Sequence, residues 1–296
     1  MQTEGWKKLG WQGLVFAVPE SWDLSAYSGT YRKGYLRLDD SERIRLEVRW
    51  ERPSRQVDIE DVVTGSLKTA AKLARRHKLD FRSKRHLKVN DPGQVRQECF
   101  RWTADVQAID LVRQCGICGR LVYVRVLGEA GAREGLLATA RRIFNGLTDH
   151  PDDDWILWRV FGLDARVQKG YGLSRGRLLA GRIYLCFRKA SEVLEIERTA
   201  LADQELKGCS VQEWLIGRLA DPGRHTVVCE GEMHGHPLWI ACRTKRSWWG
   251  ARHAPQTLIA WHCEATNRLF SVALSRGGID DLGRQARICC HELISP

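Results

Sequence analysis

The sequence lacks long apolar runs and recognisable catalytic motifs. No stretch of the 296 residues approaches the roughly 18 apolar residues of a transmembrane helix, and the first residues have no apolar segment behind their charges. We find no P-loop, no G-x-S-x-G elbow and no H-E-x-x-H motif. These absences predict a cytoplasmic protein outside the membrane, and they give no positive indication of an enzyme.

Ten cysteines are present, mostly within apolar, strand-like segments. A disulfide framework is expected in exported proteins, and the N-terminal residues do not predict an export signal. A reduced cysteine in an apolar segment behaves as a small hydrophobic residue. We therefore expect mostly reduced, buried thiols.

Positive charge exceeds negative charge, with 47 Lys and Arg against 36 Asp and Glu and a net charge of +11. Most of the basic residues are Arg, whose planar guanidinium suits contacts to phosphate or carboxylate. A bias of the source genome toward Arg codons would produce the same excess. An anionic partner and a codon bias therefore both remain open.

The sequence also repeats itself. An Asp-Pro-Gly turn occurs in each half, at Asp91–Gly93 and Asp221–Gly223. Apolar positions recur at one constant offset: Trp6, Leu14, Val18, Trp22, Leu24 and Leu36 match Trp155, Leu163, Val167, Tyr171, Leu173 and Leu185. We predict two tandem modules, residues 1–149 and 150–296, joined by a polar linker near Pro151.

Each module is predicted to be an α+β unit, an antiparallel sheet packed with helices, in the order three strands, helix, three strands, helix. The first long helix is expected near residues 58–76, with Asp58 as its N-cap. The strands after it align Cys99 with Cys229. The second module is expected to end on a helix that contains Cys289 and Cys290.

The segment Phe16-Ala17-Val18-Pro19-Glu20-Ser21-Trp22, placed early in this element order, resembles the "F-x-V-P-x-x-W" segment of the Mog1/PsbP-like α/β-sandwich superfamily. The second module departs from it, with Ala165 and Gln168 where the first has Phe and Pro. The resemblance implies non-catalytic binding or assembly work, and this implication is an analogy of fold.

The sharpest local motif is Cys115-Gly116-Ile117-Cys118, which resembles a zinc knuckle. A structural zinc site needs four ligands, and Cys99 is a candidate third ligand from a neighbouring strand. A redox pair and simple reduced thiols are the alternatives. Zinc is the one cofactor that the sequence suggests.

Two basic segments interrupt the repeat. The first contains Arg75, Arg76, Lys84 and Arg85, and the second contains Arg243, Lys245, Arg246, Trp248, Trp249 and Arg252. Arg and Trp anchor protein interfaces, and the same residues neutralise phosphates and stack on bases of single strands. A solvated hairpin whose tryptophans fold back on the module is the third interpretation.

We therefore expect a non-enzymatic binding or assembly protein, an adaptor whose two modules present a joint surface to a protein partner. The alternative is a basic protein that binds RNA or single-stranded DNA through the Arg/Trp hairpin.

Overall fold

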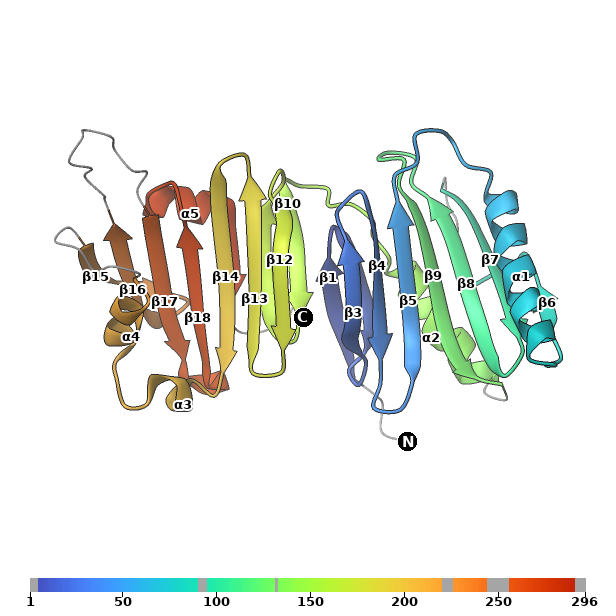
Figure 1. Ribbon diagram of the computed structural model, residues 1–296, viewed down its shortest axis with the longest axis horizontal. Coiled ribbons are helices and arrows are strands. Elements are labelled where there is room, and N and C mark those ends of the chain that lie inside the picture. Colours follow the sequence, from blue (N-terminus) through green and yellow to red (C-terminus); the bar gives the residue numbers. More distant parts are fainter. Residues whose placement is uncertain (1–4, 90–94, 131–132, 220–225, 244–255, 291–296) are drawn as a thin grey trace. The chain divides into compact units, whose positions relative to one another are not determined.

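A computed structural model describes residues 5–89, 95–130, 133–219, 226–243 and 256–290. The chain divides into two compact units, Met1–Asp152 and Asp153–Pro296 (Figure 1). Both are rich in antiparallel strands and carry helices, so the expected α+β class is confirmed. No described helix is both long and apolar enough to cross a membrane.

Unit 1 contains a seven-stranded antiparallel sheet in the order β3-β4-β5-β9-β8-β7-β6 and a separate β1–β2 hairpin. Its strands are β1 (Trp6–Trp11), β2 (Leu14–Pro19), β3 (Asp23–Gly29), β4 (Lys33–Asp39), β5 (Ile44–Glu51), β6 (Arg82–Lys84), β7 (Arg96–Thr103), β8 (Val106–Gln114) and β9 (Leu121–Glu129). Its helices are α1 (Ile59–Arg76) and α2 (Arg133–Asn145).

The strands of unit 1 follow from alternation of apolar and polar residues. In β5, Leu46 and Val48 are fully buried, whereas Glu47 between them faces the opposite side of the sheet and is only half-buried. Helix α1 begins where the Asp58 side chain accepts a hydrogen bond from the Glu60 backbone N–H at 2.9 Å, as the sequence predicts.

The two helices of unit 1 lie on opposite faces of its sheet (Figure 1). Helix α1 packs on β7 and β8, with Ile59 and Val63 in a core that includes Phe100 and Val112. Helix α2 packs on the other face, against β8, β9 and β2. Within the described part of unit 1, no helix covers β3, β4 and β5 on the α1 side, so this part of the sheet face is open.

Unit 2 contains a second seven-stranded antiparallel sheet, in the order β12-β13-β14-β18-β17-β16-β15. Its strands are β10 (Trp155–Val160), β11 (Leu163–Gln168), β12 (Gly172–Leu179), β13 (Arg182–Lys189), β14 (Glu192–Ala200), β15 (Thr226–Met233), β16 (His236–Arg243), β17 (Gln256–Cys263), β18 (Arg268–Leu274) and β19 (Ala286–Cys289). Its helices are α3 (Ala202–Leu206), α4 (Val211–Gly217), the 3-10 turn η1 (Glu264–Thr266) and α5 (Ile279–Gln285).

The structure corrects the expected end of unit 2. Helix α5 ends at Gln285, and the following residues form β19, which pairs with β11 so that Ala165 lies opposite Ile288. Ala286 and Ile288 are buried and Arg287 between them is exposed, which is the period of a strand. Cys289 therefore belongs to a strand, and the predicted helix there is wrong.

Two further predictions of order are also wrong. Five strands precede the first helix in each unit, because a short hairpin stands before the three strands that the sequence indicated. The predicted alignment of Cys99 with Cys229 does not agree with the strand order. Cys99 on β7 lies opposite Leu111 on β8, one strand in from the edge of its sheet, whereas Cys229 lies on the edge strand β15, opposite Ile240.

Candidate functional site

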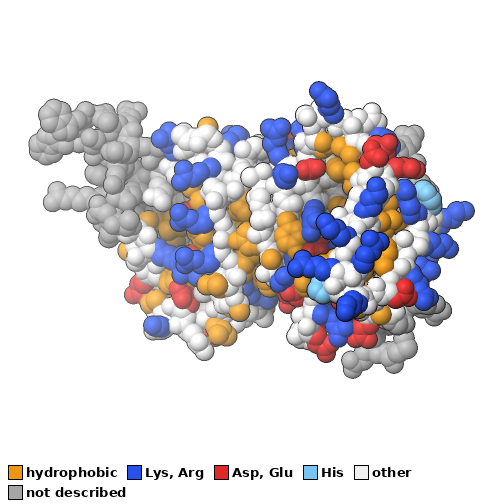
Figure 2. Space-filling view, turned by 45° about the vertical axis from the view of Figure 1, so that its right-hand side comes forward, with side chains coloured by type: hydrophobic (Ala, Val, Ile, Leu, Met, Phe, Trp, Pro, Cys, Tyr) orange, Lys and Arg blue, Asp and Glu red, His pale blue; other side chains and the backbone are white. Residues whose placement is uncertain are grey.

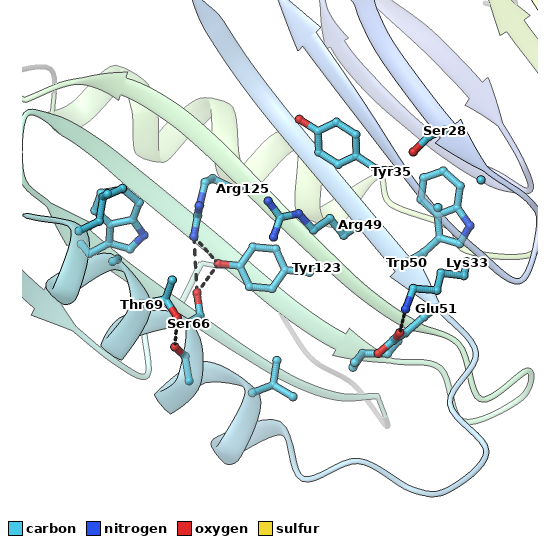
Figure 3. A pocket seen from close by; sticks show the side chains of 18 residues that line it. Ser28, Lys33, Tyr35, Arg49, Trp50, Glu51, Ser66, Thr69, Tyr123 and Arg125 are labelled. Atoms are coloured by element: carbon cyan, nitrogen blue, oxygen red, sulfur yellow. Dashed lines mark hydrogen bonds and ion pairs between the residues drawn. The ribbon is translucent and has the colours of Figure 1, made fainter.

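A groove of about 750 Å³ opens on the face of unit 1 that α1 covers only in part (Figure 3). One wall is α1, which contributes Ser66 and Thr69. The other wall is the open sheet face, where Tyr35 on β4, Arg49 on β5 and Tyr123 on β9 project toward the helix side. The groove exists because α1 is displaced toward β7 and β8 and leaves β4 and β5 uncovered, while Tyr123 on β9 meets the helix at Ser66.

The floor of the groove is a fixed polar network. Asp110 is fully buried and accepts hydrogen bonds from the Arg125 guanidinium at 3.0 Å, from Trp102 Nε1 at 3.1 Å and from the Tyr123 hydroxyl. The Ser66 hydroxyl on α1 lies 2.8 Å from the Tyr123 hydroxyl and joins the helix to this network. Burial, and then the negative charge of Asp110, raise the pKa of Tyr123. Because Asp110 neutralises Arg125, the floor offers shape and hydrogen bonds but little net charge.

Arg49 is the cation that the groove leaves available. Its guanidinium lies 5.8 Å from the centre of the Tyr35 ring and forms no ion pair with any described residue. The Tyr35 hydroxyl donates a hydrogen bond to Glu47 at 2.8 Å. Burial and this hydrogen bond raise the pKa of Tyr35 to about 12, so the phenol stays neutral. Lys33 at the same rim is paired with Glu51 at 3.2 Å.

Apolar side chains complete the groove. Trp50 packs beneath Gly34, where an added Cβ would lie 2.3 Å from the indole ring. Leu73 on α1 lines the rim with 57% of its surface exposed. Figure 2 shows that basic and hydrophobic side chains alternate over this part of unit 1. Aromatic rings and an unpaired arginine are residue types that anchor protein interfaces, and the exposed leucine adds apolar surface beside them.

The predicted basic residues have different environments. Arg75 and Arg76 are exposed in the last turn of α1, and Lys84 is exposed on the edge strand β6. Arg85 instead donates two hydrogen bonds of 2.8 Å to the buried Glu98, and hydrogen bonding to Glu98 is the main cause of its raised pKa. Arg85 therefore ties β6 to β7 and is not available to a ligand.

The second basic segment lies at the end of β16. Arg243 is the last residue of that strand. The remaining predicted residues, Lys245, Arg246, Trp248, Trp249 and Arg252, lie outside the described residues.

The Cys115–Cys118 motif forms the turn between β8 and β9, as the sequence predicts. The Cys118 backbone N–H donates to Cys115 Sγ at 3.4 Å, and the Gly119 N–H donates to the Cys115 carbonyl at 3.0 Å. Gly119 has φ +70°, a conformation that favours glycine. Asp149 and His150, which follow α2, complete a set whose potential ligand atoms all lie within 4.8 Å of one another.

Cys99, the third predicted ligand, does not belong to this set. It lies on β7, and burial raises the pKa of its thiol to about 12, which fits a core thiol. Asp149 and His150 were not predicted as ligands, because Asp149 was placed at the end of the first module and His150 in the polar linker. No spacing rule connects them to a cysteine pair more than thirty residues earlier.

A second potential ligand set lies in unit 2. His236 on β16, Cys263 on β17 and Cys290 after β19 also place their ligand atoms within 4.8 Å of one another. Cys263 and Cys290 are buried. This set has three members, one fewer than a closed structural zinc site requires.

No family model matches the chain, and no curated protein matches its sequence. Among solved structures, the chain is similar to the immunity protein TplEi of T6SS from Pseudomonas aeruginosa, which was solved complexed with an "L" peptide. The two are 7% identical, the match covers 97% of this chain and 99% of that chain, and the TM-score is 0.35. At these values the likeness supports no conclusion about fold or function.

Proposed function

We propose that the chain is a non-catalytic binding protein that takes up a segment of a protein partner in the α1 groove of unit 1. The observation that supports this proposal is the composition of the groove, in which Tyr35, Arg49 and Leu73 are accessible around a fixed polar floor. Tyr and Arg are enriched among the residues that dominate binding energy at protein interfaces. A rigid floor favours binding because little conformational entropy is lost on association.

The chemistry of the groove favours a partner segment with an acidic and an apolar side chain. Arg49 is the side chain that would pair with a negative charge of the partner. Arg125 is already neutralised by Asp110, and Lys33 is paired with Glu51. A carboxylate of the partner would gain a charge-assisted hydrogen bond from Arg49. An apolar side chain beside it would cover the exposed part of Leu73.

We further propose that units 1 and 2 are copies of one module. Support comes from the two large sheets, in which the third strand pairs with the strand that comes last in the sequence of that sheet: β5 pairs with β9, and β14 pairs with β18. We also propose that the module is related to the Mog1/PsbP-like superfamily, which is supported by the segment 16–22. A cytoplasmic location is a further part of the proposal.

A selection from a displayed library of random peptides tests the groove directly. We expect wild-type protein to enrich peptides that combine Asp or Glu with an aromatic or aliphatic residue. The variant Arg49→Glu should bind the enriched peptides at least about tenfold more weakly, because it replaces an attraction by a repulsion. The variant Arg177→Glu is the matched control, since Arg177 is an exposed arginine of unit 2.

Two results would contradict the proposal. One is the absence of any enriched peptide family. The other is a family whose binding falls equally in Arg49→Glu and Arg177→Glu, because non-specific attraction to a basic protein would explain it. Titration calorimetry of synthetic peptides supplies the affinities.

Binding of RNA or single-stranded DNA is the alternative function. It is supported by the exposure of Arg75, Arg76 and Lys84, which leaves three cations near one end of α1 and on β6 accessible to phosphates.

A further inference from the structure

The turn between β8 and β9 brings a sulfur-rich set of metal ligands together at one end of the sheet of unit 1. Cys115 and Cys118 come from the turn itself, and Asp149 and His150 come from the segment after α2. We propose that these four residues bind one zinc ion. The ion would link the segment after α2, through Asp149 and His150, to the β8–β9 turn. The proposal is independent of the function proposed for the α1 groove.

The distances between ligand atoms agree with tetrahedral zinc. Bond lengths of about 2.3 Å to sulfur and about 2.0–2.1 Å to nitrogen or oxygen place sulfur and a neighbouring N or O ligand about 3.5 Å apart. Cys115 Sγ lies 3.5 Å from His150 Nδ1, and Cys118 Sγ lies 3.4 Å from Asp149 Oδ2. The other oxygen of the same carboxylate, Asp149 Oδ1, lies 3.2 Å from His150 Nδ1, so the carboxylate lies beside both Cys118 and His150.

The backbone of the turn prepares the two sulfurs for a cation. The Cys118 N–H points at Cys115 Sγ, so a backbone hydrogen bond already holds this sulfur in place within the turn. The positive φ of Gly119 lets the chain reverse directly after the second cysteine, and the Cys115 N–H closes the turn on the Arg120 carbonyl at 2.9 Å. This arrangement fits the knuckle that the sequence suggested.

Neighbouring residues orient the other two ligands. Arg120 is buried and donates to the Asp149 carbonyl at 2.8 Å, which ties the ligand segment to β9. Arg113 lies 4.0 Å from Asp149 Oδ1. Two thiolates and a carboxylate carry one more negative charge than zinc neutralises, and Arg113 is placed to balance that excess. Ligands held by such outer contacts are typical of metal sites in proteins.

The ligand types select among metals. Two thiolates with an imidazole favour zinc over magnesium or calcium, which take oxygen ligands. An iron–sulfur cluster takes Cys₄ or Cys₂His₂ ligands, and the carboxylate does not fit it. With four protein ligands the site is closed, which is the form of a structural zinc site.

The test uses the full chain, produced without a histidine tag in zinc-supplemented medium and analysed by plasma mass spectrometry. We expect about one zinc per chain, bound in the four-ligand site. The variants Cys118→Ser and Asp149→Asn should retain less than about half of it, because each removes one ligand. Cys229→Ser and Asp152→Asn are the matched controls, since both side chains are exposed and outside the set, and they should retain the metal.

Cobalt substitution provides a measurement that does not depend on the variants folding. Wild-type protein loaded with Co²⁺ should show thiolate-to-cobalt charge transfer and the intense visible bands of tetrahedral coordination. Three results would overturn the proposal: wild-type protein without metal whose Cys115 and Cys118 alkylate as free thiols, a Cys115–Cys118 disulfide in its mass spectrum, or zinc that persists in Cys118→Ser and disappears in Cys290→Ser.

Discussion

Asp110 and Arg125 lie directly opposite each other on β8 and β9 and form a 3.0 Å ion pair buried beneath helix α1. Asp110 has no exposed surface. A substitution that removes its carboxylate but keeps Arg125 therefore leaves an unpaired positive charge in the interior. We expect Asp110→Asn to lower the free energy of unfolding of unit 1 by about 3 kcal/mol. Urea denaturation followed by circular dichroism measures the change.

Asp80→Asn is the control for this prediction. Asp80 also pairs with an arginine, Arg82, at 2.9 Å, but both side chains are largely exposed. An exposed pair contributes about 0–1 kcal/mol, so this variant should unfold almost as the wild type does. Equal effects of the two variants would show that the network under α1 does not stabilise unit 1.

Replacing each of two glycines of unit 1 by alanine should change the free energy of unfolding in opposite directions. At Gly34 an added Cβ would lie 2.3 Å from the Trp50 ring and 2.6 Å from the Ser28 carbonyl oxygen, whereas at Gly65 in α1 nothing lies within 4 Å. We expect Gly34→Ala to destabilise by about 1–3 kcal/mol through overpacking. Gly65→Ala should stabilise by about 0.5–1 kcal/mol, because alanine is the better helix former.

The same denaturation measurement compares both variants with the wild type. A Gly34→Ala variant as stable as the wild type would mean that the Trp50 ring moves freely, and the groove would then lack a rigid wall.

Much of the fold could be predicted from local patterns. The alternation around Leu46 and Val48 and the Asp58 cap are local signals, and the structure confirms both. The number of strands was not predicted as well. Three strands are expected after the helices of the second module, whereas four are present, β15 to β18, and the alignment of Cys99 with Cys229 therefore falls on the wrong strand.

The candidate sites show the same limit. The turn at Cys115 and Cys118 could be predicted, since a C-x-x-C-G segment forms a tight turn by local geometry. Asp149 and His150 could not, because only the path of α2 across the sheet returns the chain to that turn. The α1 groove gave no sequence signal at all, since Tyr35 and Arg49 look like ordinary residues on a solvated strand face.

A salt-dependent binding measurement decides whether the exposed basic residues of unit 1 bind nucleic acid. Fluorescence anisotropy with a labelled single-stranded RNA should show weaker binding for the triple variant Arg75→Glu, Arg76→Glu and Lys84→Glu, and a dependence on log salt reduced by up to about 3. The matched control reverses three exposed arginines of unit 2: Arg175, Arg177 and Arg188. Equal losses in the two triple variants would contradict a specific phosphate-binding surface on unit 1.

Glu197 gives unit 2 a predictable dependence on pH. Burial alone would raise the pKa of this carboxyl, but hydrogen bonds from Arg218 at 2.9 Å and from Arg182, which lies 2.8 Å away, outweigh burial and hold the pKa below its ordinary value of 4.5. A pKa lower in the folded than in the unfolded state means that ionised Glu197 contributes its full stability above pH 4.5. That contribution is lost as the pH falls from 4.5 through the folded pKa.

The variant Glu197→Gln should therefore be less stable than the wild type at neutral pH, and the difference should shrink below pH 4.5. Urea midpoints measured across this range for both proteins give the comparison. Glu232→Gln is the control, because Glu232 is an exposed carboxylate of the same unit. If the profiles of Glu197→Gln and wild type run parallel down to acidic pH, the two arginines do not favour the ionised carboxylate, and the stability of unit 2 in acid must depend on other groups.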